Sequence, residues 1–113
     1  MLNLSAATRV FVATQPVDLR RSFNGLFACV QQQLRLDPLS GHLFVFCNRT
    51  RNRLKILVWD GSGLWVCAKR LERGRFSWPA PTPGGGVATL RNEELIALTS
   101  GLEVRAKRGW YRR

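Results

Sequence analysis

Few residues in this chain could carry out catalysis. Its single histidine, His42, stands in a Ser-Gly-His turn before a strand-like segment, and a catalytic histidine needs a positioned partner. A metal-dependent nuclease needs carboxylates that converge on a divalent ion. Each carboxylate that could do so has a simpler local role as a cap, a turn residue or a neighbour of bases; these are Asp18, Asp37, Asp60 and Glu72. We therefore predict a protein that is not an enzyme and has no catalytic residues.

Cysteine is the other residue type that could hold a metal. Cys29, Cys47 and Cys67 are odd in number, far apart in sequence, and each lies in an apolar stretch. Metal sites use closely spaced cysteines, and disulfide frameworks use even numbers of them. We predict buried, reduced thiols with no metal and no other cofactor, as is typical of a reducing cytoplasm.

Basic residues dominate the chain. Eighteen Lys and Arg oppose seven Asp and Glu, which gives a formal net charge of +11. Such a chain repels itself when compact and usually has a polyanionic partner: nucleic acid, an anionic membrane or an acidic protein. No apolar run approaches ~18 residues, and the start MLNLSAATRV lacks the features of a signal peptide. We therefore expect a cytoplasmic protein with no membrane partner.

The bases concentrate between residues 49 and 75, where eight bases meet two acids. The stretch AKRLERGRFSWP (68–79) adds two aromatic residues, and arginine stacks on rings and bases. We expect Leu71 and Phe76 to point into the core and Gly74 to let the chain turn, so that the neighbouring bases point outward at phosphates. The predicted nucleic-acid-binding residues are Arg49, Arg51, Arg53, Lys55, Lys69, Arg70, Arg73, Arg75 and Trp78.

Hydrophobic periodicity predicts the elements that hold these residues. A β-rich segment at 9–14 is expected to form the first strand. An apolar stripe at helical spacing follows, and we expect this helix to pack on a sheet; its residues are Phe23, Leu26, Phe27, Val30 and Leu34. We expect Asp18 to cap this helix, with residues 19–21 in its first turn, and the Asp37-Pro38 pair to follow its end.

Three strands are predicted at 42–48, 54–60 and 64–71. The turn at 60–63, with two glycines, predicts a hairpin. In the resulting register Trp59 pairs with Leu64, and Arg53 lies beside Arg70, although like charges opposite each other are destabilising. The strand centres are apolar on both faces, so a helix on one face and a second helix or a subunit partner on the other must cover them.

A second helix is predicted after Asn92, which we expect to cap it, with two acids in the first turn. Its apolar residues are expected to be Leu95, Ile96, Leu98 and Leu102, with Gly101 at its end. Residues 79–86 are predicted to form a loop, and residues 105–113 a basic tail. We assign Trp59 and Trp65 to the core. Together these elements predict a single α+β domain over residues 1–113. Its architecture is a small, mostly antiparallel sheet of four to five strands packed with two helices.

Two long stretches carry a resemblance to a known family. They read PVDLRRSFNGL at 16–26 and DPLSGHLFVFCNRTRNRLKILVWDGSGLWVCAKRLERGRFSWP at 37–79. With the small loop and the LIAL helix that follow, they resemble the accessory TnpB-type protein encoded by the second reading frame of IS66 insertion sequences. The resemblance covers about residues 9–105. The tail matches only loosely, so no role of the family is assigned to Arg112 or Arg113.

The resemblance implies a role in bacterial transposition, beside a separate large transposase that carries the catalytic acids. Two functions stay open. One is an accessory protein that binds the DNA of element ends or target through phosphates, and the other is an adaptor that docks on the transposase without touching DNA. An enzyme is a distant third. The choice between DNA and RNA and the formation of homo-oligomers are left undecided by the sequence.

Overall fold

A five-stranded sheet forms the centre of the protein in the computed structural model, which describes residues 5–81 and 86–100. The strand order is β4-β3-β2-β1-β5. β1 and β2 are parallel, and all other neighbours are antiparallel. The strands are β1 (Val10–Ala13), β2 (Leu43–Cys47), β3 (Arg53–Trp59), β4 (Leu64–Arg70) and β5 (Val87–Leu90). This confirms the predicted α+β fold with a mostly antiparallel sheet.

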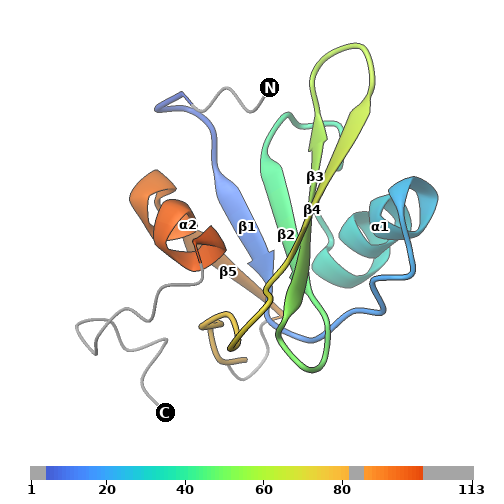
Figure 1. The fold of residues 1–113 in the computed structure, drawn as a ribbon. Helices are drawn as coiled ribbons and strands as arrows, with labels where there is room; N and C mark the ends of the chain where they lie inside the picture. The colour runs from blue at the N-terminus through green and yellow to red at the C-terminus, as the bar shows by residue number, and fades with distance from the viewer. Residues whose placement is uncertain (1–4, 82–85, 101–113) are drawn as a thin grey trace.

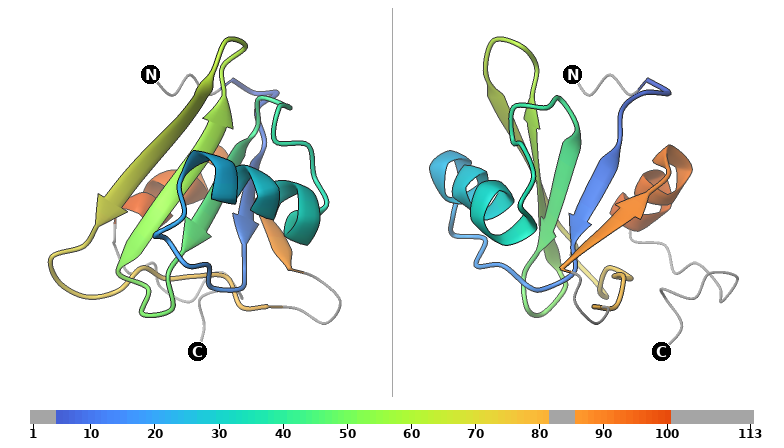
Figure 2. Two further views of the ribbon diagram at one scale, coloured as in Figure 1. Left: turned by 90° about the vertical axis from the view of Figure 1, so that its right-hand side faces the viewer. Right: turned by 180° about the vertical axis from the view of Figure 1, so that it is seen from behind.

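Two helical layers enclose the sheet, with α2 (Asn92–Thr99) on one face and α1 (Phe23–Cys29) on the other (Figure 1, Figure 2). α1 continues into a π-helical segment, η1 (Val30–Leu34). α1 and η1 belong to the chain that connects β1 to its parallel neighbour β2. Since α2 lies on the second face of the sheet, a helix of the same chain provides the cover that the apolar strands required.

Each face of the sheet has its own hydrophobic core. On the α1 side, Leu26 and Val30 pack with Phe44, Phe46 and Leu57, and all five side chains are fully buried. The α2-side core includes two helical leucines with alternate residues of the strands: Leu95, Leu98, Val10, Val12, Leu43, Val45, Leu54, Ile56 and Val58. The two clusters explain why the central strands are apolar at consecutive positions.

The β3–β4 hairpin has the predicted register, with Trp59 opposite Leu64 and Arg53 opposite Arg70. Asp60 closes its turn by accepting hydrogen bonds from the N–H groups of Ser62 and Gly63 at 2.8 and 2.9 Å. The same carboxylate accepts from the indole N–H of Trp65 at 2.8 Å. The turn residue Gly61 has a φ of +100°, which glycine adopts without strain.

The predicted start of the first helix is wrong. The helix begins at Phe23, and Asp18 does not cap it. Asp18 instead accepts a hydrogen bond from the N–H of Arg20 at 3.0 Å and binds its guanidinium group. A carboxylate that bonds to the backbone two residues on stabilises a turn in place of a helix. Residues 19–21 therefore form a turn before the helix.

The helical stripe is confirmed in its centre and wrong at its beginning. Leu26 and Val30 are fully buried, and Phe27 and Leu34 are half-buried against the same cluster. Phe23 is 47% exposed because it is the first helical residue and lies at the end of the stripe. The expectation that its ring packs firmly on the sheet is therefore corrected.

The second helix is present, but its predicted details change. Its N-cap is Arg91, and Asn92 is its first residue. The Glu94 carboxylate accepts a hydrogen bond from the Arg91 N–H at 2.8 Å. Ile96 is 64% exposed, since neighbouring helical residues point in directions about 100° apart and the buried leucines already face the sheet. The predictions for residues 101–113, including Leu102 and Gly101, concern positions outside the described residues.

Two further features were not predicted. β5 pairs with β1 through a four-residue segment for which the sequence pattern predicts no element. Trp65, which was assigned to the core, is 43% exposed because β4 is the outermost strand on its side of the sheet.

No helix in the described part of the chain is both long and apolar enough to cross a membrane.

Candidate nucleic-acid interface

The loop between β2 and β3 is held in shape by one asparagine. The Asn48 side-chain oxygen accepts from the N–H groups of Asn52 and Arg53, each at 3.1 Å. Its amide nitrogen donates to the side-chain oxygens of Thr50 and Asn52 at 3.1 and 2.8 Å. These bonds fix the loop backbone and leave Arg49 exposed at its tip.

The segment after β4 is hydrogen-bonded to the same loop. The Leu71 N–H donates to the Asn52 carbonyl at 2.8 Å, and the Phe76 N–H donates to the Arg51 carbonyl at 2.7 Å. Phe76 is buried and Leu71 is half-buried against the α2-side core, as predicted. Between these anchors Gly74 has a φ of +75°, a left-handed conformation that favours glycine. Backbone hydrogen bonds thus hold the bend between Leu71 and Phe76 at both ends.

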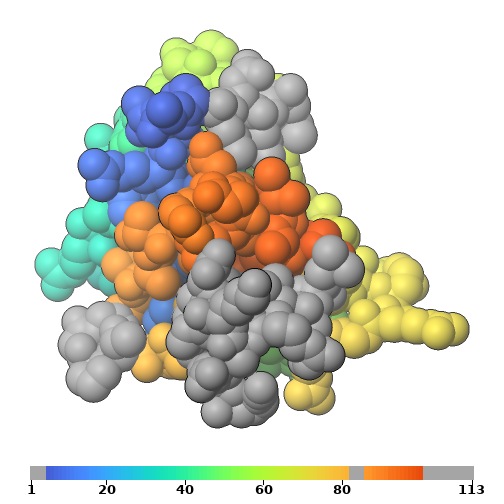
Figure 3. Space-filling model, turned by 90° about the vertical axis from the view of Figure 1, so that its left-hand side faces the viewer, coloured from blue at the N-terminus to red at the C-terminus, as the bar shows by residue number. Residues whose placement is uncertain are grey.

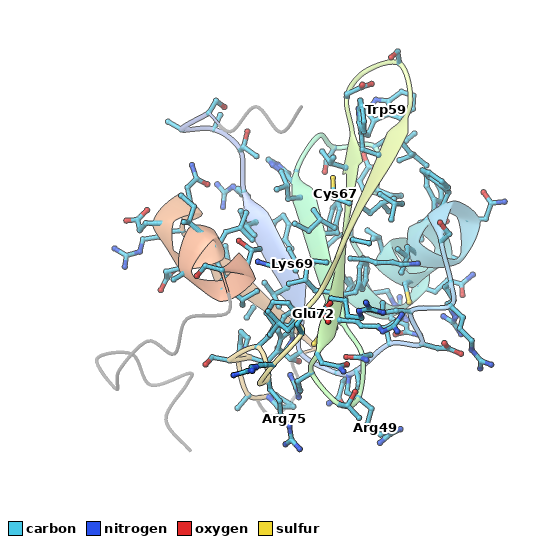
Figure 4. The ribbon with its side chains drawn as sticks, in the orientation of Figure 1. Arg49, Trp59, Cys67, Lys69, Glu72 and Arg75 are labelled. Atoms are coloured by element: carbon cyan, nitrogen blue, oxygen red, sulfur yellow. The ribbon has the colours of Figure 1, made fainter. Side chains whose placement is uncertain are left out.

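The loop and the bend together present three exposed arginines, Arg49, Arg73 and Arg75, here called the basic end. Figure 4 shows Arg49 and Arg75 at the same end of the sheet, away from Trp59. In Figure 3 the segment that follows β4, drawn in yellow, projects beyond the rest of the molecule. The arginines of the basic end therefore reach solvent from a backbone that hydrogen bonds hold in place.

A second set of bases lies on the α1 face. Residues opposite each other in an antiparallel pair share a face, so Arg53 and Arg70 lie together on the side of Leu57. Two open hollows of about 490 and 400 Å³ adjoin there, and both are lined by Leu19 and Arg53. We call their basic lining on this face the basic groove; it consists of Arg20, Arg49, Arg53, Lys55 and Arg70. Arg49 belongs to both the groove and the basic end.

Two acids lie in the groove, and each is paired with a base. Asp18 binds Arg20 at 2.7 Å, and Glu72 binds Arg70 at 3.2 Å. The hydrogen bonds from the Arg20 side chain are the largest reason that the pKa of Asp18 falls from 3.8 to about 2. All four side chains are well exposed, and exposed ion pairs contribute little to stability.

Three of the predicted contact residues make contacts within the protein. Adjacent strand residues point to opposite faces, so Lys69 is turned away from Arg70, and its ammonium donates to the Thr99 carbonyl at the end of α2 at 2.7 Å (Figure 4). Trp78 is only 8% exposed, and its indole N–H donates to the Ala13 carbonyl at 2.9 Å. The Arg51 guanidinium lies 5.9 Å from the centre of the Trp78 ring. These three side chains are engaged within the protein.

The other six predicted residues lie at the basic end or in the groove: Arg49, Arg53, Lys55, Arg70, Arg73 and Arg75. Lys55 is half-buried, and its ammonium donates to the Arg21 carbonyl at 2.9 Å. Sequence reasoning missed Arg20 as a groove residue. The only local signal is the Asp18–Arg20 spacing, which also fits the beginning of a helix.

The residues first considered for catalysis have structural contacts. His42 accepts a hydrogen bond from the Arg9 N–H through Nδ1 at 3.0 Å. The hydrogen bonds to Asp60 hold its pKa well below its usual range. Burial raises the pKa of the Cys47 thiol to about 12. Within residues 5–81 and 86–100, no three His, Cys, Asp or Glu side chains are grouped as they would be to hold a metal ion.

Comparison with known proteins identifies the family. The family described as IS66 Orf2-like protein matches residues 8–109. The chain belongs to this family. Two relatives from Sinorhizobium fredii (strain NBRC 101917 / NGR234), both named as uncharacterized, are y4jC and y4hO. y4jC is 43% identical over 109 residues, which cover 96% of this chain and 92% of the relative. y4hO is 41% identical over 105 residues, which cover 93% and 90%.

No solved structure matches the chain. The IS66 Orf2-like family is associated with insertion sequences, which indicates a transposition-associated accessory protein. It is not a family of known catalytic proteins. The family assignment thus agrees with the resemblance seen in residues 16–26 and 37–79.

Proposed function

We propose that this IS66 Orf2-like protein is a non-catalytic accessory factor that binds DNA through the phosphates, using the basic groove and the basic end together. One observation supports the proposal most directly: Arg49 belongs to both surfaces, and hydrogen bonds from Asn48 fix the loop on which it lies. Phosphate contacts give affinity and position without reading sequence.

The chemistry of the surface favours nucleic acid over an apolar docking partner. The linings of the two hollows mix apolar side chains with charged ones. Arg53 and Arg70 sit on paired strands, Arg49 on the Asn48-braced loop, and Arg20 in the turn before α1. The opposed Arg53 and Arg70 repel each other across the hairpin. A bound phosphate between or beside them would neutralise that repulsion, so binding and local stability are expected to be coupled.

The test replaces Arg49, Arg53 and Arg70 together by Gln. A matched control replaces Arg9, Arg35 and Arg91 by Gln, which removes the same charge from exposed positions outside the groove. Fluorescence anisotropy measures binding to an element-end duplex and to a scrambled duplex over a salt series. The groove variant should lose affinity about equally on both duplexes, and its salt slope should fall by roughly two to three units.

The control variant should show a smaller loss and nearly the parental salt slope. If both variants bind alike, the charge of the whole chain, and not the groove, governs binding. If a folded groove variant keeps full affinity, the proposal fails. The competing adaptor role, in which the bases meet acids of the element's transposase, would then be the better hypothesis.

A further inference from the structure

The outer strand β4 differs from the rest of the sheet in its exposure. All five residues of β2 are buried, whereas every residue of β4 is half-buried or exposed. β4 is last in the strand order, so no strand of the described chain pairs with its outer side. Edge strands are normally protected by charges, prolines or bulges. The segment 64–68, LWVCA, has no charge and no proline, in a chain with eighteen Lys and Arg.

The hydrogen-bond pattern shows which backbone groups face outward. Bonds at either end of the β3–β4 ladder join Asp60 to Gly63 and Leu71 to Asn52. Pairs in an antiparallel ladder alternate between bonded and non-bonded, so the odd-numbered residues of β4 bond to β3. The even-numbered residues therefore direct their N–H and C=O groups away from the sheet. Within residues 5–81 and 86–100, no strand pairs with these groups.

Exposed apolar surface flanks this edge on the α2 face. Trp65 is 43% exposed and Ile96 is 64% exposed. Between α2 and β4 lies a mostly apolar hollow of about 250 Å³, whose lining includes Cys67, Lys69 and Ile96. Small-molecule sites usually measure ~300–1,000 Å³, so the hollow suits a single large side chain better than a ligand.

We propose that β4 is a dimerisation edge at which a second copy of this chain adds antiparallel, with the two-fold axis at Cys67. Val66 then pairs with Ala68 of the partner subunit through the outward backbone groups. Trp65 faces Lys69 of the partner subunit, and its ring enters the partner's hollow beside that lysine. Because both copies give and receive the same contact, the interface closes as a symmetric dimer.

Charge selects this arrangement among the possible pairings. Antiparallel pairing about Cys67 sets the uncharged half of each strand against the basic half of the other, and a lysine beside an indole ring gains a cation–π attraction. Parallel pairing in register would set Lys69 beside Lys69 of the partner subunit, and like charges directly opposite are destabilising. The strand is therefore complementary to itself in one direction only.

Sedimentation velocity on the full chain without DNA tests the dimer. The parent should show a concentration-dependent monomer–dimer equilibrium. Trp65→Lys and Trp65→Glu both remove the ring but place opposite charges against Lys69 of the partner subunit. We expect the lysine variant to dissociate about tenfold or more readily than the glutamate variant. Circular dichroism checks that both are folded. A parent that stays monomeric, or two variants that dissociate equally, would overturn the proposal.

Cross-linking tests the register separately, in a Cys67→Ser background. In the proposed pairing position 66 lies opposite position 68 of the partner subunit, with Cα atoms ~5.5 Å apart, which suits a disulfide. A mixture of Val66→Cys and Ala68→Cys chains should form disulfide dimers far faster than either chain alone. Equal rates in all three samples would refute the register. Neither experiment involves DNA or the basic groove, so each result is separate from the test of DNA binding.

Discussion

The arginines of this protein differ in what their side chains contact. Arg51 lies over the Trp78 ring, Arg20 binds Asp18, and Arg49 reaches solvent at the tip of its loop. A count of positive charges in the sequence treats these three alike. Their contacts separate a packing residue, an ion-paired residue and an exposed residue.

The Asp18–Arg20 pair makes a testable prediction about titration. The pKa of Asp18 is lowered to about 2, with hydrogen bonds from Arg20 as the largest cause and the charge of Arg21 as a minor one. A carboxylate with a lowered pKa stabilises the fold above its unfolded pKa near 3.8, and this contribution is lost as the pH falls through about 2. In an NMR titration, Arg20→Gln should move the Asp18 midpoint clearly toward 3.8.

Arg21→Gln is the matched control, because it removes the same charge one residue away. It should leave the Asp18 midpoint close to 2. Equal shifts in the two variants would mean that general positive potential, rather than the hydrogen bonds of Arg20, lowers the pKa.

The Cys47 thiol should be protected from alkylation. Its side chain is 1% exposed, and burial raises its pKa to about 12. Since the thiolate is the reactive form, iodoacetamide at pH 8 should label Cys47 only after denaturant unfolds the chain. Peptide mass spectrometry measures the labelling. Rapid labelling of Cys47 in the native protein would contradict its placement in the core.

At the scale of elements, the helix on the α1 face stabilises the sheet through a few residues. Leu26 and Val30 are fully buried against Phe44 and Phe46, while Phe23 at the helix start is half-exposed. The π-helical turn that follows ends at Arg35, whose φ of +58° marks the left-handed end of the helix. The residues at the centre of the stripe therefore contribute more to the stability of the fold than its first residue does.

Truncation of these side chains should reproduce that gradient. Leu26→Ala removes a fully buried side chain and should destabilise the protein by about 2–5 kcal/mol. Phe23→Ala should cost about 1 kcal/mol or less, because much of the ring already contacts water. Phe27→Ala, at a half-buried position, should fall between them. Urea denaturation measures the three values, and a larger loss for Phe23 than for Leu26 would refute the packing described above.

For the molecule as a whole, the dominant property is its charge of +11. One face of the hairpin carries the basic groove, and the outer edge and α2 face carry an uncharged strand segment, Trp65 and Ile96. These surfaces respond oppositely to salt. Counterion release makes phosphate binding weaker as salt rises, whereas screening reduces the repulsion between two basic chains.

Salt should therefore act in opposite directions on the two proposed interactions. Over ~50–300 mM NaCl, the affinity for DNA should fall steeply. The association constant of the dimer, measured by sedimentation, should rise over the same range. The two measurements use the same protein at the same salt concentrations. A dimer that weakens with salt would indicate that ion pairs hold it together, contrary to the apolar contact of Trp65.

Elements whose signals are local could be predicted from the sequence alone. The hairpin register followed from the Asp60–Gly63 turn, and the centre of the first helix followed from its apolar spacing, because turn chemistry and periodicity act between near neighbours. Apolar residues on both faces of the strands also predicted that both faces are covered. The family resemblance lay in contiguous stretches, so it too needed no structure.

Which of the predicted contact residues bond within the protein depends on contacts that only the folded chain makes. The Trp78 indole is buried because Ala13, 65 residues earlier, offers it a carbonyl, and no local pattern contains that contact. The Lys69 ammonium bonds to the Thr99 carbonyl, 30 residues later, because α2 packs on the face of the sheet to which Lys69 points. Asp18 bonds to Arg20 in a turn because that local bond competes with a helix cap. Trp65 is exposed because β4 ends the strand order, and the position of a strand in its sheet depends on the whole chain.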